Sequence, residues 1–326
     1  ITQDNYASFV KKFKQKEEWE GEVTPIENLA YPEQAFDERG MARDGSHWVA
    51  FNFKPFPSTF WPTNGSTGDV MIRLPKAFRE RNSEFSLDVY FANLSLVEMA
   101  IKDLQEISVP PISEIAVGKD LNNNGKLDDK VEWIQRQDKY LGDAAEVEVA
   151  HMLYPQETEI LHTVRYIGVD ENGNIYNAPR MKEVRYMKKH RFKSKAAMAS
   201  EYYMESKEKH FEQLPQIVHL GDKGVNNKFG WTINGYIEGT NGELRHQYDQ
   251  EMAFCSGCHK TIGATIDQTF SFPRKVEGAA GWGYINLARM TDVPNIGEEK
   301  GEFLTYLGRV GGCLLYTSPS PRDSDQ

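Results

Sequence analysis

The chain has 326 residues and a net charge of −10; 39% of its residues are hydrophobic and 26% are charged. This composition is typical of a globular protein, and the length allows one large domain or two ordinary ones. No run of about eighteen apolar residues occurs, so we expect no membrane span. Acidic residues are spread along the chain, which argues against nucleic acid as a partner.

The two ends of the sequence do not have the features of native termini. Ile1 is not an initiator methionine, which indicates that upstream sequence is missing or has been removed. Residues 313–326 resemble a translated sequencing adaptor, and we expect them to be a non-native tail. Without Cys313 only Cys255 and Cys258 remain, which excludes a disulfide framework and a four-cysteine zinc site.

The N-terminal half contains helix and strand patterns in mixed order. Residues 1–20 have the composition of a short polar helix. Residues 47–53 and 69–74 alternate between apolar and polar side chains, as strands do. We expect a further strand over residues 86–94. A helix should follow over residues 94–107, where apolar side chains recur at helical spacing.

The C-terminal half is richer in strand patterns. Strands flank an Asp-Glu-Asn-Gly-Asn turn at residues 170–174 and a Gly-Thr-Asn-Gly-Glu turn at residues 239–243. A helix is expected after Ser194, with this serine as its N-cap. A short helix should lead into residues 255–259, and an amphipathic helix should cover residues 298–312.

Residues 255–259 read Cys-Ser-Gly-Cys-His, the attachment motif of c-type haem. Two thiols on one helical turn add across the two vinyl groups of haem, and the adjacent imidazole reaches the iron. We therefore expect Cys255 and Cys258 to hold haem c covalently and His259 to be the proximal iron ligand. Two alternatives remain open: half of a zinc site, which needs two more ligands, and a dithiol motif, which needs a helix N-terminus.

The opposite side of the iron would decide the kind of haem protein. A methionine or histidine there gives an electron carrier, and an open position binds small ligands. Met290 is the leading candidate, because it lies between His259 and the last predicted helix, an order that resembles class I cytochromes c. Met252, His219 and His246 are weaker candidates.

Three stretches resemble the cytochrome P-460 family of β-sheet haem proteins. They are residues 153–166, 230–245 and 255–272, which look like that family's Phe-Pro strand, Gly-Trp hairpin and haem motif. The resemblance implies an open distal site. It places the family's cross-linking lysine at His162, so the cross-link cannot form and a gas-binding member is favoured. His162 could then donate a hydrogen bond to a bound ligand; otherwise it simply points out of a strand.

A polar loop matches the first half of a calcium-binding loop. Oxygen-bearing side chains alternate before Gly125, and a further aspartate follows: Asp120, Asn122, Asn124 and Asp128. The closing glutamate should stand at Val131, but Glu132 is one residue beyond it. A single structural calcium ion is therefore expected here, with an Asn-Gly turn held by its own side chains as the alternative.

Together these patterns predict an α+β protein in which an antiparallel sheet region with helices binds haem c on a short helical segment. Residues 1–145 form a mixed α/β region without an assigned role, and residues 146–312 form the β-rich haem domain. Haem attachment implies export to the bacterial periplasm or beyond. The expected function is single-electron transfer to a redox partner protein such as another cytochrome. The alternatives are a five-coordinate haem protein acting on hydroxylamine or nitric oxide, and a haem-based sensor module.

Overall fold

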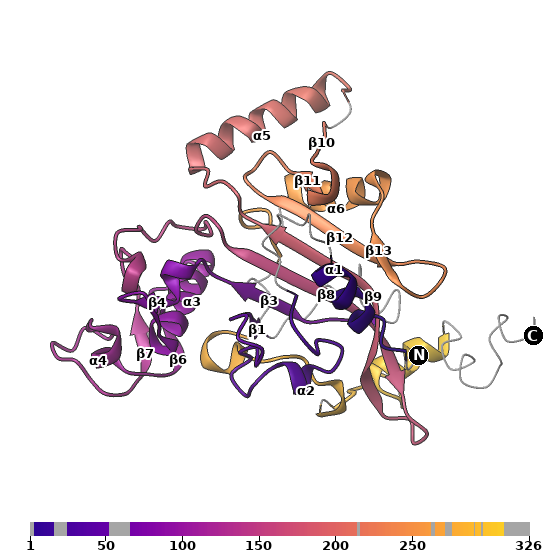
Figure 1. Ribbon diagram of the computed structural model, residues 1–326, viewed down its shortest axis with the longest axis horizontal. Coiled ribbons are helices and arrows are strands. Elements are labelled where there is room, and N and C mark those ends of the chain that lie inside the picture. Colours follow the sequence, from indigo (N-terminus) through magenta and orange to yellow (C-terminus); the bar gives the residue numbers. More distant parts are fainter. Residues whose placement is uncertain are drawn as a thin grey trace, which may run out of the picture.

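The computed structural model describes residues 3–15, 25–51, 66–213, 216–261, 265–270, 276–289, 291–294 and 296–309. Within them lies a nine-stranded sheet in the order β1-β3-β8-β9-β12-β11-β10, with β2 paired to β8 and β13 to β12 (Figure 1). Every pairing in this sheet is antiparallel. Its strands are β1 (Val49–Phe51), β2 (Ser66–Thr67), β3 (Val70–Arg73), β8 (Glu159–Val169), β9 (Ile175–Lys188), β10 (Val218–His219), β11 (Val225–Asn226), β12 (Thr232–Glu238) and β13 (Leu244–His246).

Helices and two small sheets complete the fold, which is α+β with a mostly antiparallel sheet, as expected. The small sheets pair β4 with β5 and β6 with β7. The remaining elements are α1 (Tyr6–Gln15), α2 (Pro32–Ala35), β4 (Glu80–Arg81), β5 (Glu84–Phe85), α3 (Leu87–Lys102), β6 (Glu106–Ile112), α4 (Glu114–Val117), β7 (Val131–Gln135), α5 (Lys195–His210), α6 (Asp249–Thr261) and α7 (Glu302–Arg309).

The hairpin of β8 and β9 forms the middle of the sheet. Its turn is the predicted one at residues 170–174, where the Asp170 carboxylate accepts the backbone N–H groups of Asn172 (2.9 Å) and Asn174 (2.8 Å). The second predicted turn, at residues 239–243, joins β12 to β13. Both turns are confirmed, because short polar Asx and glycine signals are read locally.

Side chains of the sheet divide between two cores, because successive residues of a strand point to opposite faces. In β3, Val70 and Ile72 join a core that includes α3 and α6, while Met71 joins the core on the other face. In β9, Met187 belongs to the first core and Tyr186 to the second. Both faces of the sheet are therefore buried, and α3 and α6 cover the same face.

The second face is covered by α1 and by residues 26–48. Figure 1 shows α1 in front of β8 and β9, and its Phe9 packs edge-on against Tyr236 with ring centroids 4.7 Å apart. Arg165, which is fully buried on this side, donates a hydrogen bond to the carbonyl oxygen of Ala30 (2.9 Å). The N-terminal segment is thus part of the same fold as the sheet.

The helix α3 begins earlier than the sequence suggested, so the strand expected over residues 86–94 is wrong. The Ser86 side chain caps the helix by accepting the N–H of Val89 (3.3 Å). Every residue from Val89 to Ile101 is buried. Because the helix is enclosed on all sides, packing outweighs the strand preference of its aromatic and β-branched residues.

The predicted helices in the later part of the chain are present. The Ser194 side chain caps α5 as predicted, by accepting the N–H of Ala197 (3.3 Å). The last predicted helix is present as α7. Residues 313–326 lie outside the described part of the chain.

The large sheet takes strands from both sides of the boundary suggested at residues 145 and 146. Within the described ranges, no helix is long and apolar enough to cross a membrane.

Removing the cap of α3 should destabilise the whole protein. We expect Ser86→Ala to lower the free energy of unfolding by about 1 kcal/mol, because an N–H at the start of a buried helix loses its acceptor. Urea denaturation followed by circular dichroism measures this loss. Ser194→Ala is the matched control: it removes the same kind of cap from α5, in which Met198 is the buried residue. Equal losses in the two variants would contradict the prediction.

Candidate functional site

The helix α6 carries the Cys-x-x-Cys-His motif and is anchored by Met252. This side chain is 1% exposed and packs in the core shared with α3. The helix approaches β12 closely because Gly235 has no side chain. A Cβ at that position would lie 2.3 Å from Oε1 of Gln247 and 3.3 Å from Sδ of Met252. The predicted short helix before the motif is confirmed; it continues through both cysteines and is kinked at His259, whose φ of −95° and ψ of +30° are not helical.

The two thiols of the motif lie one helical turn apart, and both are half-buried and free. The Cys255 thiol donates a weak hydrogen bond to Oε1 of Gln247 (3.6 Å). Burial raises the pKa of the Cys255 thiol, and the Arg185 guanidinium opposes this effect. Phe254 is 74% exposed, and its position four residues before Cys258 makes the two neighbours on the helix surface.

His259 is held at both its ring and its backbone. Its Nδ1 lies 2.7 Å from the carbonyl oxygen of Gln268, so Nδ1 carries the proton and Nε2 keeps its lone pair. The His259 carbonyl oxygen accepts a hydrogen bond from the Asn227 side chain (2.8 Å). Burial lowers the pKa of His259 to about 4. At neutral pH the ring is therefore neutral, which is the form that ligates metals.

His162 lies on the face of the sheet that α6 covers. It is directly opposite Arg185 in the β8–β9 pair, and Arg185 is opposite Gly235 in the β9–β12 pair. Opposed residues share a face, so the three form a row on the side where Gly235 meets α6. Arg185 is paired with Glu183 (2.6 Å) in the same region. His162 thus lies on the face of the sheet that α6 covers, and this placement does not test the distal role expected for it.

The other proposed axial ligands have different surroundings. His219 Nδ1 lies 3.0 Å from Oδ1 of Asp249, at the start of α6. His246 Nε2 lies 2.7 Å from Oδ1 of Asn234. Both contacts give these histidines a structural role in joining neighbouring elements. Met290 lies outside the described residues.

The geometry argues against the two alternatives to covalent attachment. Cys255 lies at the middle of α6 and Cys258 in its second half, away from the N-terminus where the helix dipole would favour a thiolate, so a thioredoxin-type dithiol is poorly placed. In the part of the chain that the structure describes, no group of three His, Cys, Asp or Glu side chains could hold a metal ion. A zinc site built from protein ligands alone is therefore not formed there.

The candidate calcium ligands lie together on the loop between α4 and β7. The Asp120 carboxylate accepts the N–H groups of Asn124 (3.3 Å) and Gly125 (2.8 Å). Asp128 accepts from the Asn124 side chain (2.6 Å) and pairs with Lys126 (2.8 Å), and these contacts lower the pKa of its carboxyl. These hydrogen bonds within the loop also suit an Asn-Gly turn held by its own side chains, so the calcium site remains untested.

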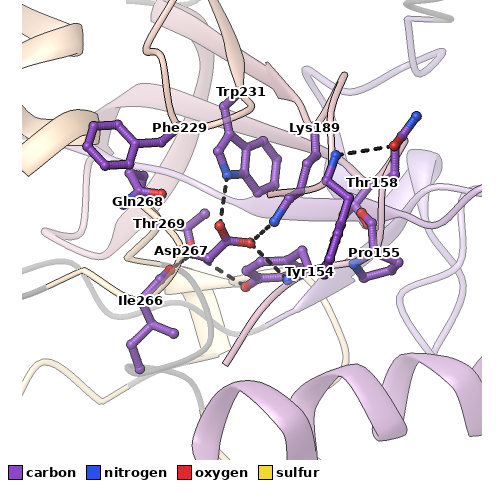
Figure 2. Close-up of polar contacts among 12 residues, drawn as sticks. Tyr154, Pro155, Thr158, Lys189, Phe229, Trp231, Ile266, Asp267, Gln268 and Thr269 are labelled. Atoms are coloured by element: carbon purple, nitrogen blue, oxygen red, sulfur yellow. Dashed lines mark hydrogen bonds and ion pairs between the residues drawn. The ribbon is translucent and has the colours of Figure 1, made fainter. Parts of the chain in front are cut away.

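Figure 2 shows a buried polar cluster that sequence reasoning missed. The Lys189 ammonium donates to Oδ2 of Asp267, and neither side chain has exposed area. Asp267 also accepts the N–H of Tyr154 (2.8 Å) and the indole N–H of Trp231 (3.5 Å). Burial lowers the pKa of Lys189 and raises that of Asp267, and each partner opposes the shift of the other. The pair spans 78 positions, so no local sequence signal joins it.

Fold and site together define an α+β protein with a thiol and imidazole site on a helix. A family model described as “-like lipoprotein” matches residues 1–318, and the chain belongs to this lipoprotein family. An “Uncharacterized lipoprotein” of Aquifex aeolicus (strain VF5) is 34% identical over 293 residues, which are 86% of this chain and 47% of that protein. The chain thus spans about half the length of this relative. No solved structure matches the present chain.

These findings overturn the identification as a c-type cytochrome and the resemblance to the cytochrome P-460 family. Neither the family nor the relative is described as a haem protein. Among the described residues, no three His, Cys, Asp or Glu side chains are grouped so that they could hold a metal ion. The expected haem redox function was therefore wrong, both as electron transfer and as reaction with small nitrogen compounds or sensing. A short motif specifies side-chain chemistry but no activity. Membership of a lipoprotein family is consistent with the expected export.

The lowered pKa of His259 should make the stability of the chain without a cofactor depend on pH. Its pKa of about 4 lies below its ordinary value of 6.5, so the unfolded chain binds more protons in this window. The free energy of unfolding should rise by up to about 3 kcal/mol from pH 4 to pH 6.5 on account of this group. Urea denaturation across that range should show a smaller rise for His259→Gln. The exposed His210→Gln should behave as wild type; identical slopes for all three proteins would contradict the prediction.

Proposed function

We propose that the chain is an extracytoplasmic binding module of its lipoprotein family and that the end of α6 holds its prosthetic group. One observation carries the proposal: the neutral His259 ring is fixed through Nδ1 to the Gln268 carbonyl, next to two free thiols on the same helix. A histidine whose second nitrogen is held by a backbone carbonyl is the usual arrangement of a metal-ligating imidazole.

Haem c is the group that this set of side chains suits. Cys255 and Cys258 would each add S–H across a vinyl group, which forms a C–S bond and needs no oxidant. His259 would supply an axial nitrogen through Nε2. The proposal concerns attachment and assigns no electron-transfer role.

The proposed location at a membrane follows from membership of the lipoprotein family. Lipoproteins are held at a membrane by attached lipid rather than by a spanning helix. We place the described domain in the periplasm or on the outer surface of a bacterium, which is where both haem attachment and lipid anchoring take place. The match covers 47% of the longer relative, so the activity of that whole protein can depend on residues that this chain does not span.

Attachment can be tested by intact mass spectrometry of the denatured chain after export in a host with haem c maturation. The wild type should gain the mass of one haem. The double variant Cys255→Ala/Cys258→Ala should not, because neither thioether can form. Cys313→Ala is the matched control and should gain haem as the wild type does, since it changes the cysteine outside the motif.

Three outcomes of that measurement would overturn the proposal. Free thiols in the exported wild type would show that α6 holds no covalent group. A mass lower by two hydrogens would show a Cys255–Cys258 disulfide in its place. Equal haem gain by the double variant would also count against it, because attachment would then not involve the motif.

We also propose one calcium ion in the loop of Asp120 and Asp128. The supporting observation is that the Asp120 carboxylate already gathers the backbone N–H groups of Asn124 and Gly125. Gly125 has a φ of +86°, the left-handed conformation that the sixth position of a calcium loop uses. Lys126 would have to release Asp128 when the ion binds, because the two are paired at 2.8 Å.

Calcium at about millimolar concentration should raise the melting temperature of the wild type, and a chelator should reverse the shift. Asp120→Ala should remove the response because the first ligand of the loop is lost. Differential scanning calorimetry measures both. Asp37→Ala is the matched control, because Asp37 likewise accepts the backbone N–H groups of Arg39 (2.9 Å) and Met41 (2.8 Å) but stands in a turn without alternating oxygen ligands. No shift in the wild type, or an equal shift in Asp120→Ala, would refute the calcium site.

A further inference from the structure

The buried pair of Lys189 and Asp267 is costly for a structural contact. Both side chains are removed from water, and burying two charges costs several kcal/mol that their attraction only partly restores. An apolar pair of the same volume would serve the core at least as well. The ammonium also lies 5.5 Å from the ring centres of Phe192 and Trp231, so its surroundings are otherwise apolar. Packing alone therefore does not explain why this buried pair is charged.

The pair holds a turn whose backbone is unusual. Asp267 and Gln268 both have positive φ values, +48° and +59°, which non-glycine residues seldom adopt. Backbone hydrogen bonds between Ile266 and Thr269 close the turn (3.2 and 3.0 Å). The Asp267 side chain fastens it from outside, to Lys189 and to the N–H of Tyr154 (2.8 Å). Two successive left-handed residues are thus held by contacts that the turn itself does not make.

The turn presents the carbonyl oxygen of Gln268 to α6, and Phe270, the next residue after the turn, packs edge-on against the His259 ring with centroids 5.5 Å apart. This oxygen accepts the Nδ1–H of His259 at 2.7 Å. The other end of Gln268 is held as well, because its side-chain amide donates to the Tyr202 hydroxyl at 2.5 Å. A displaced turn would release the imidazole from the acceptor that selects its tautomer.

We propose that Lys189 and Asp267 are positioning residues for His259: the buried ion pair holds the turn from Ile266 to Thr269 so that the Gln268 carbonyl fixes the imidazole with Nε2 unprotonated. The purpose of this arrangement rests on the proposed function, in which Nε2 is the axial ligand. The ion pair, the turn and the contact to the imidazole are present in the chain without a prosthetic group. The positioning can therefore be tested independently of attachment.

The test is the tautomer of His259 at neutral pH in the folded chain without a cofactor. Nitrogen NMR of protein labelled at its histidine rings separates protonated from unprotonated ring nitrogens, and loss of one pair of signals in His259→Gln assigns them. The wild type should show His259 as a single tautomer, protonated at Nδ1. In Asp267→Asn and Lys189→Met the signals should move towards the tautomer mixture of a free imidazole.

The double variant Lys189→Met/Asp267→Asn guards against simple misfolding of the single variants. It leaves no unpaired buried charge, and asparagine tolerates the left-handed backbone at position 267. We expect it to fold and yet to lose the single tautomer. Asp69→Asn is the matched control: it changes a buried carboxylate paired with Arg165 (3.5 Å), and it should leave His259 as in the wild type.

Three results would overturn the inference. A folded double variant that keeps the wild-type tautomer would show that the pair does not position the ring. An unfolded double variant would show that the pair serves the fold instead. An equal loss of the tautomer in Asp69→Asn would show a general effect of buried charge. Absence of haem in the mass experiment, with these NMR results as expected, would leave the positioning intact and refute only the attachment.

Discussion

The antiparallel pairing of β8 with β9 is the constraint on which the rest of the structure depends. Every other strand of the large sheet joins this hairpin directly or through a neighbour. Because alternate side chains of these strands enter different cores, the register of one hairpin decides which residues face α6 and which face α1. A slip of β9 by one residue against β8 would turn Arg185 away from the site and bring Tyr186 to that face.

The candidate site forms where three separate segments meet that sheet. The helix α6 brings the thiols and imidazole, Gly235 of β12 lets it approach, and the turn after α6 supplies the carbonyl that holds His259. Lys189, one residue beyond β9, ties this turn back to the sheet. Functional side chains of this kind are rigid because each is held by a neighbour that is itself held.

The motif led to a wrong identification for a physical reason. Cys-x-x-Cys-His predicts two thiols and an imidazole close together on one helix; in the structure both thiols lie on α6, and His259 stands at a kink of the same helix. Whether electrons or small molecules pass through such a site depends on what surrounds it, and three loosely similar stretches were not enough to establish that. The family match over residues 1–318 places the chain among lipoproteins, where the same side chains support a proposal about attachment alone.

Local signals in the sequence determined the α+β class, the turns at residues 170–174 and 239–243, the cap at Ser194 and the composition of the motif. These depend on side chains close in sequence, which act in the same way in any fold. Tertiary structure alone decided that residues 86–94 are helical, because burial on all sides outweighs strand preference. It alone joined Lys189 to Asp267 across 78 positions and set Gln268 against His259. Contacts between distant segments depend on how the whole chain folds, and local sequence patterns do not predict which distant residues will meet.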